Sequence, residues 1–172
     1  MKILKFKSFF ESVKINDEDK TFVILSLSNE NTNLTDISKI SKNFSNDVKN
    51  VIKNLPKSLG DLCRELFSEK GFGEEQTFEY VEDRDLNNIE KNLQTSANVV
   101  FSTKYNIQAN VEDNKVIENF IKRISDGVRK GSKNMNCNVL LFSTNPQSNS
   151  IEIYMNNKWQ KNDALRKLYL GK

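Results

Sequence analysis

The sequence TFVILSLS, residues 21–28, contains FVIL at 22–25, an apolar run as long as any in the chain. Its β-branched and aromatic residues favour a strand, and a short apolar run bounded by polar residues is typical of a strand that is buried. Four residues fall far short of the roughly 18 apolar residues that a membrane-spanning helix needs. We therefore expect a buried strand here and no membrane span in the sequence.

A long amphipathic helix is predicted downstream of this strand. Between residues 36 and 55 the apolar side chains recur every three or four positions and share a stripe about 120° wide, and Thr35 can cap the helix. Pro56 cannot continue it, because proline has no backbone N–H and its ring clashes with the preceding turn. Residues 59–70 are therefore expected to form a separate helix, ended by Gly71, and to complete an αα-hairpin.

A second long helix is predicted over 115–128, where the apolar spacing is again helical and Asp113 or Asn114 can cap it. The remaining segments predict strands at 77–81, 98–103, 107–111, 138–143 and 150–155, and short helices at 85–93 and about 162–169. The strands at 98–111 and at 138–155 are expected to form two hairpins, which indicates an α+β fold. We therefore predict a single α+β domain over residues 1–172, with a mostly antiparallel sheet and the two long amphipathic helices packed on one face.

Composition excludes several kinds of active site. The chain contains no histidine, which removes Ser-His-Asp and Cys-His catalysis and histidine-bound zinc. Its two cysteines, Cys63 and Cys137, do not have metal-binding spacing, and we expect both to be buried and reduced, with a disulfide between them as the alternative. The net charge of +3 is close to balanced and by itself demands no nucleic-acid partner. No cofactor is expected.

The opening residues, MKILKFKSFFES at 1–12, allow several interpretations. As a helix they would be amphipathic, which permits a position at a membrane surface. The alternation in MKILKFK also permits a first strand of the sheet. A secretory signal is not expected, because lysines interrupt the apolar run and no small-residue cleavage site follows it.

The opening residues also resemble the capsid-targeting peptide of large contractile-tailed phages. The positions that match are Met1, Lys2, Phe6, Phe9, Phe10, Glu11 and Ser12. In that family the peptide directs internal proteins into the prohead, and the prohead protease cuts after the glutamate. The family prefers Leu or Ile where this chain has Phe9, and the resemblance covers about 12 of the 172 residues. It implies removal of residues 1–11 and a location in the host-cell cytoplasm or in the virion.

Two basic helix faces are candidate nucleic-acid contacts. The first consists of Lys39, Lys42, Lys49 and Lys53, which lie opposite the apolar stripe. The second consists of Lys115, Lys122, Arg123, Arg129 and Lys130. Basic residues on one surface bind phosphates through counterion release, which gives salt-sensitive affinity without sequence preference. The alternative is that both are ordinary solvated helix faces.

An acidic segment at 74–85, EEQTFEYVEDRD, is a candidate metal site. Two-metal nucleases hold Mg²⁺ with converging carboxylates, and such ligands could come from Glu79, Glu82, Asp83 and Asp85. The alternative is a loop whose carboxylates face water.

The sequence contains no assembled catalytic motif, which favours a protein that acts by contact. We interpret it as a non-enzymatic, phage-type interaction protein, associated with the virion, that binds a protein partner. The alternative is a nucleic-acid-binding or metal-dependent nuclease-like protein that uses the basic helix faces and the acidic segment 74–85. The sequence leaves the oligomeric state open.

Overall fold

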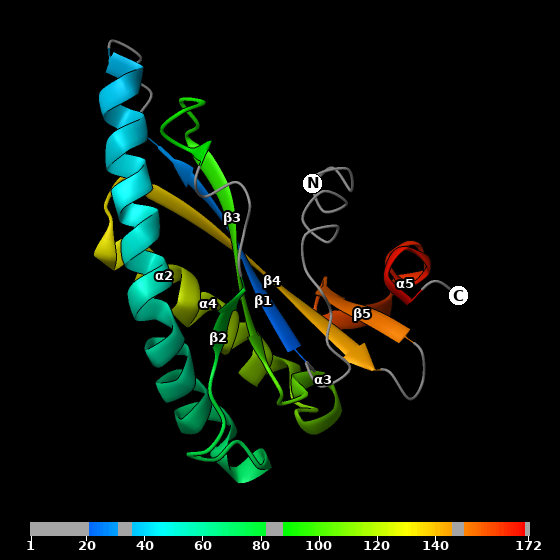
Figure 1. Cartoon of the computed structure of the whole chain (residues 1–172). Coiled ribbons are helices and arrows are strands. Elements are labelled where there is room, and N and C mark those ends of the chain that lie inside the picture. Colours follow the sequence, from blue (N-terminus) through cyan, green and yellow to red (C-terminus); the bar gives the residue numbers. More distant parts are fainter. Residues whose placement is uncertain (1–20, 31–35, 82–87, 146–149, 171–172) are drawn as a thin grey trace.

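The chain folds around strand β1 (Thr21–Asn29). The computed structural model describes residues 21–30, 36–81, 88–145 and 150–170 (Figure 1). The six antiparallel strands lie in the order β2-β3-β1-β4-β5-β6. The other five are β2 (Glu79–Val81), β3 (Ser96–Thr103), β4 (Met135–Asn145), β5 (Ser150–Met155) and β6 (Lys158–Lys161). β1 pairs with β3 on one side and with β4 on the other, which confirms the buried strand expected at 21–28.

Both faces of the sheet are buried at β1. Successive side chains of a strand point to opposite faces, so Val23 and Leu25 contribute to the core under the helices, while Phe22 and Ile24 contribute to a second cluster on the other face. That second cluster also contains Val100, Phe142, Ile151 and Ile153. Burial on both faces explains why FVIL is a continuous apolar run.

The helix α2 (Ile37–Phe67) is a single element, so the αα-hairpin expected with a break at Pro56 is wrong. A proline inside a helix costs about 3 kcal/mol. However, Leu59, Cys63 and Phe67 are fully buried beyond it, and each buried apolar side chain stabilises the fold by about 1.5–3 kcal/mol. Core packing therefore outweighs the local cost of Pro56.

The helix α4 (Asn114–Gly131) confirms the second long helix and packs with α2 on the same face of the sheet (Figure 1). The side chain of Asp113 caps it by accepting a hydrogen bond from the N–H of Lys115, at 2.9 Å. The side chain of Asp36 caps α2 by accepting from the N–H of Lys39, at 3.0 Å, so the cap lies one residue after the expected Thr35. The α+β class and the helices on one face are as predicted.

Three shorter elements differ from the expectations. Residues 107–111 do not form a strand: α3 (Ile107–Asn110) is a short helix, because the side chain of Asn106 accepts a hydrogen bond from the N–H of Ala109. The described part of the expected helix at 85–93, residues 88–93, consists of turns. The segment around Trp159 forms β6, an edge strand that was not expected.

The C-terminal helix α5 (Asp163–Leu170) confirms the short helix expected near 162–169 and contacts β5. Within the described ranges, no helix is both long enough and apolar enough to cross a membrane.

Candidate binding groove between α2 and α4

A groove of about 600 Å³ separates α2 from α4 on the side away from the sheet. Val51, Leu55 and Leu62 of α2 line it together with Ile124 and Val128 of α4. Val51, Leu55 and Leu62 are only half-buried, so the groove exposes aliphatic carbon to solvent. We call this feature the α2–α4 groove.

Two glycines of α4 line the groove. Gly127 and Gly131 are four residues apart, so they lie on the same side of α4 and face α2. A Cβ atom at either position would meet no heavy atom within 4 Å. The groove therefore has room for a side chain at either of these two positions.

Polar contacts join the helices near each end of the groove. The hydroxyl of Ser132 donates to the carboxylate of Asp47, at 2.9 Å. At the other end the guanidinium of Arg123 bonds both carboxylate oxygens of Glu65, at 2.7 and 2.9 Å. This hydrogen-bonded pair lowers the pKa of Glu65, so it is ionised at neutral pH. These contacts fix the separation of α2 and α4. The two charged side chains that line the groove, Asp47 and Arg123, both take part in them.

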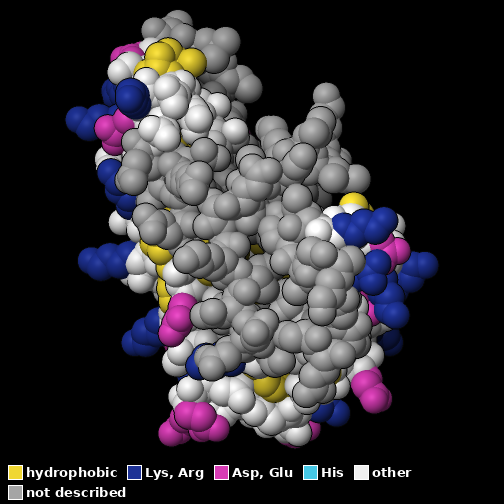
Figure 2. All heavy atoms as spheres, turned by 45° about the vertical axis from the view of Figure 1, so that its right-hand side comes forward, with side chains coloured by type: hydrophobic (Ala, Val, Ile, Leu, Met, Phe, Trp, Pro, Cys, Tyr) yellow, Lys and Arg dark blue, Asp and Glu magenta, His cyan; other side chains and the backbone are white. Residues whose placement is uncertain are grey.

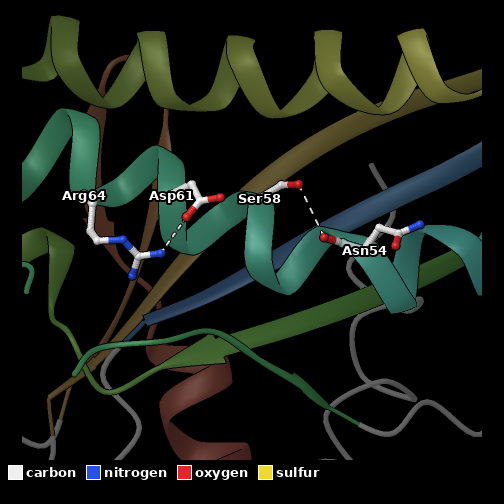
Figure 3. Close-up of polar contacts among 4 residues, drawn as sticks. All are labelled: Asn54, Ser58, Asp61 and Arg64. Carbon is white, nitrogen blue, oxygen red and sulfur yellow. Dashed lines mark hydrogen bonds and ion pairs between the residues drawn. The ribbon is translucent and has the colours of Figure 1, made fainter. Parts of the chain in front are cut away.

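Apart from Asp47, the rim that α2 contributes is polar but uncharged. It includes Asn50, Asn54 and Ser58, which are exposed on successive turns. Figure 3 shows Asn54 and Ser58 on α2 with α4 running alongside; the hydroxyl of Ser58 donates to the backbone carbonyl of Asn54 at 3.3 Å. One turn further on, Arg64 and Asp61 form an ion pair at 2.7 Å. A ligand of the groove would therefore meet aliphatic carbon, amides and hydroxyls.

The basic residues of α2 do not line this groove. Lys39, Lys42, Lys49 and Lys53 are all exposed, and Figure 2 shows Lys and Arg side chains spaced along the outer side of α2, with acidic side chains between them. Lys49 lies 4.0 Å from Glu90. At 3.6 residues per turn, these lysines point about 120° away from Asn54 and Ser58.

The basic residues of α4 divide into two groups. Lys115, Lys122, Arg129 and Lys130 are exposed, while Arg123 is held by Glu65 at the groove. Lys122 and Arg129 lie about 160° around α4 from the groove-facing glycines. The structure therefore places the two basic faces on separate surfaces, and nucleic-acid binding stays a prediction.

The metal and processing predictions fall mostly on residues that are not described. Glu79 is exposed on β2, whereas Glu82, Asp83 and Asp85, like Glu11 and Ser12, lie outside the described residues. Across the described ranges, no group of three or more Asp, Glu, Cys or His side chains could hold a metal ion.

The two cysteines are free and buried, as expected. Burial raises the pKa of the Cys137 thiol to about 12 and that of Cys63 further above its ordinary value. Because the thiolate is the reactive form, neither side chain is a nucleophile at neutral pH.

Sequence reasoning missed the α2–α4 groove. The signal was present in Gly127 and Gly131, which share one side of a predicted helix, and in the amides and hydroxyls beside the apolar stripe of α2. Recognising it requires knowing that α2 continues past Pro56 and lies beside α4, which the sequence pattern does not give.

Comparison of the chain with known protein families, with curated proteins and with solved structures finds no match.

Proposed function

We propose that the protein is a non-enzymatic interaction protein that binds an uncharged, apolar segment of a partner protein in the α2–α4 groove. The observation that carries this proposal is the groove itself, with half-buried Val51, Leu55 and Leu62 exposed between two helices. Well-packed apolar side chains in a groove between helices are a common way to bind a partner segment.

The charges around the groove support this choice of ligand. Arg123 is paired with Glu65, and the carboxylate of Asp47 is bonded only by the neutral hydroxyl of Ser132, so the lining of the groove offers no unpaired cation to a phosphate. A partner segment with aliphatic or aromatic side chains would fill the groove, and its backbone could bond the amides of Asn50 and Asn54. The thiols are buried and protonated, which agrees with a function through contact.

A filled-groove variant tests the proposal. Gly127→Leu places a side chain in the groove, whereas Asp126→Leu adds the same side chain at an exposed neighbouring position of α4. In pull-downs from the native source, we expect the wild type and Asp126→Leu to retain one partner that Gly127→Leu loses. Both variants should keep the wild-type circular dichroism spectrum. Retention of the same partner by Gly127→Leu would reject the groove, and substrate turnover by the pure protein would reject the non-enzymatic function.

The phage origin and virion association belong to the same proposal and rest on the likeness of residues 1–12 to a capsid-targeting peptide. They predict a mature protein that begins at Ser12. The intact mass of the protein from purified virions measures this directly, and a full-length mass would exclude processing after Glu11.

The exposed lysines of α2 favour nucleic-acid binding as the second candidate. Four of them, Lys39, Lys42, Lys49 and Lys53, share one outer face, but Figure 2 shows acidic side chains interspersed on this side of the molecule. The mixed charge makes this candidate the weaker one.

A further inference from the structure

Within the described part of the chain, the outer edge of β4 has no strand neighbour over most of its length. On its inner side β4 pairs with β1 from Met135 to Ser143. On its outer side it pairs with β5 only from Phe142 to Asn145. Among the described strands, therefore, none pairs with the outer edge of residues 135–141. Figure 1 shows β4 continuing well past the region where β5 lies beside it.

The backbone of this segment offers hydrogen bonds to the open side. The hydroxyl of Ser125 on α4 donates to the carbonyl of Cys137, at 2.9 Å, so this carbonyl points away from β1. In antiparallel pairing, the backbone groups that point to one side belong to alternate residues. Val139 and Leu141 therefore present their N–H and C=O groups to the same edge as Cys137.

Side chains of α4 reach this edge at Asn136 and Cys137, whereas residues 138–141 have no charge or proline to protect them from other chains. Proteins shorten their edge strands, place charged residues and proline on them, or cover them with a helix or a loop. β6 has four residues with Lys158 and Lys161 at its ends, and β2 has three residues and begins at Glu79. The segment 135–141, MNCNVLL, has neither charge nor proline. Its composition suits pairing with a further strand.

The charges beside the edge favour an acidic strand. Ser125 faces the edge, and Lys122 and Arg129 lie three and four residues away on the same side of α4. Arg129 reaches the side chain of Asn136 on β4, at 3.4 Å. Side chains of an added strand that point toward the helices would lie near Lys122 and Arg129. Glu118 and Asp126, exposed on α4, reduce the positive charge there.

The same charges disfavour a second copy of this chain as the occupant. Edge-to-edge pairing of two β4 strands about a twofold axis would bring α4 alongside its copy. The stripe that contains Lys115, Lys122 and Arg129 would then face an identical stripe, and like charges at an interface oppose association.

We propose that the outer edge of β4, residues 135–141, binds an extended acidic segment of another protein as an additional strand of the sheet. The backbone of Val139 and Leu141 and the N–H of Cys137 would supply the hydrogen bonds, since the carbonyl of Cys137 already accepts from Ser125. Lys122 and Arg129 would select acidic side chains. This surface is separate from the α2–α4 groove, so its test does not depend on the function proposed for that groove.

Synthetic peptides test the proposal on the full chain. The probe is a fluorescent nine-residue peptide in which Glu alternates with Val and Thr. One matched peptide has Lys in place of Glu, and another keeps Glu but carries N-methyl groups on alternate backbone amides. We expect the acidic peptide to bind, in fluorescence anisotropy at low salt, at least about tenfold more tightly than the lysine peptide. N-methylation should abolish binding, because it removes the donors that a strand needs.

Protein variants assign the binding to this edge. The double variant Lys122→Glu/Arg129→Glu should reverse the preference between the acidic and the lysine peptide. The matched control, Lys39→Glu/Lys42→Glu on α2, changes the net charge equally and should leave the preference unchanged. Bound peptide should also slow hydrogen exchange at the amides of Val139 and Leu141.

Three outcomes would overturn the proposal. The first is no binding of the acidic peptide at concentrations up to about 1 mM. The second is equal binding of the acidic and lysine peptides, or equal binding after N-methylation. The third is self-association of the free chain in sedimentation, with Val139 and Leu141 protected from exchange, which would assign the edge to a second copy.

Discussion

The hydroxyl of Ser41 donates a hydrogen bond to the backbone carbonyl of Ile89, at 2.9 Å, and both residues are completely buried. This contact joins the first half of α2 to the turn that precedes β3. It satisfies a polar group on each side inside the core, where water cannot replace either partner.

Removing this hydroxyl should therefore destabilise the protein. Ser41→Ala leaves the carbonyl of Ile89 without its partner, and we expect a loss of about 1–3 kcal/mol in the free energy of unfolding. Ser38, exposed on the same helix, is the matched control, because Ser38→Ala makes the same change in helix propensity. Urea denaturation measures both. Equal effects of the two substitutions would contradict the structural role of the contact.

Replacing the proline inside α2 should stabilise the protein. Pro56→Ala restores a backbone N–H that can bond the carbonyl of Ile52, and we expect a gain of about 1–3 kcal/mol, reduced by the lost packing of the half-buried ring. Lys57→Ala, at the exposed neighbouring position, should change stability by less than about 0.5 kcal/mol. A marked loss of stability in Pro56→Ala would indicate that the two halves of α2 are separate helices.

Two glycines with equally open surroundings should respond in opposite directions to alanine. A Cβ at Gly127 or Gly71 meets no atom within 4 Å, but Gly71 has a φ of 98°. Gly127→Ala should stabilise α4 by about 0.5–1 kcal/mol, since alanine favours a helix. Gly71→Ala should destabilise the protein by about 1 kcal/mol or more, because φ is positive. Chemical denaturation distinguishes these signs.

The protein should lose stability in alkaline solution. Burial raises the pKa of Cys137 from 9.0 to about 12 and that of Tyr105 from 10.0 to about 12, and it raises the pKa of Cys63 as well. Above about pH 9 for the cysteines and about pH 10 for Tyr105, the unfolded chain therefore releases protons that the folded chain retains, so each group lowers the free energy of unfolding by up to about 1.4 kcal/mol per pH unit. Denaturation midpoints between pH 7 and 11 test this expectation.

A variant identifies the groups responsible for that alkaline loss. Cys137→Ala should fall less steeply above pH 9 than the wild type, because it removes one of the groups that titrate. Below pH 9 the stability contributed by the thiols should be fully present and independent of pH. A flat profile from pH 9 to 11 would show that the thiols are not buried in the folded chain.

Nucleic-acid binding makes a different prediction. If the outer face of α2 contacts phosphates, affinity in a filter-binding assay falls steeply with salt and is lost in the fourfold variant Lys39→Glu/Lys42→Glu/Lys49→Glu/Lys53→Glu. Gly127→Leu should leave this affinity unchanged, because the lysines lie away from the groove. No binding at low salt would exclude this candidate function.

Local patterns were sufficient for much of the fold. The apolar run at 22–25 predicted a buried strand, the three- and four-residue spacing predicted α4 and the first part of α2, and the alternating β-rich segments predicted an α+β class. These predictions hold because the 3.6-residue and two-residue periods follow from backbone geometry and need no knowledge of neighbouring elements. The absence of histidine likewise excluded several catalytic mechanisms from composition alone.

Tertiary packing determined what local patterns could not. α2 continues through Pro56 because core residues distant in the sequence bury Leu59, Cys63 and Phe67. Helix propensity is a property of the local sequence and does not include the free energy of that burial. The α2–α4 groove depends on two helices lying side by side with glycines between them, and the open edge of β4 depends on where β5 stops pairing. Each feature depends on contacts between residues far apart in the chain. Such contacts contribute to the free energy only when folding has brought those residues together.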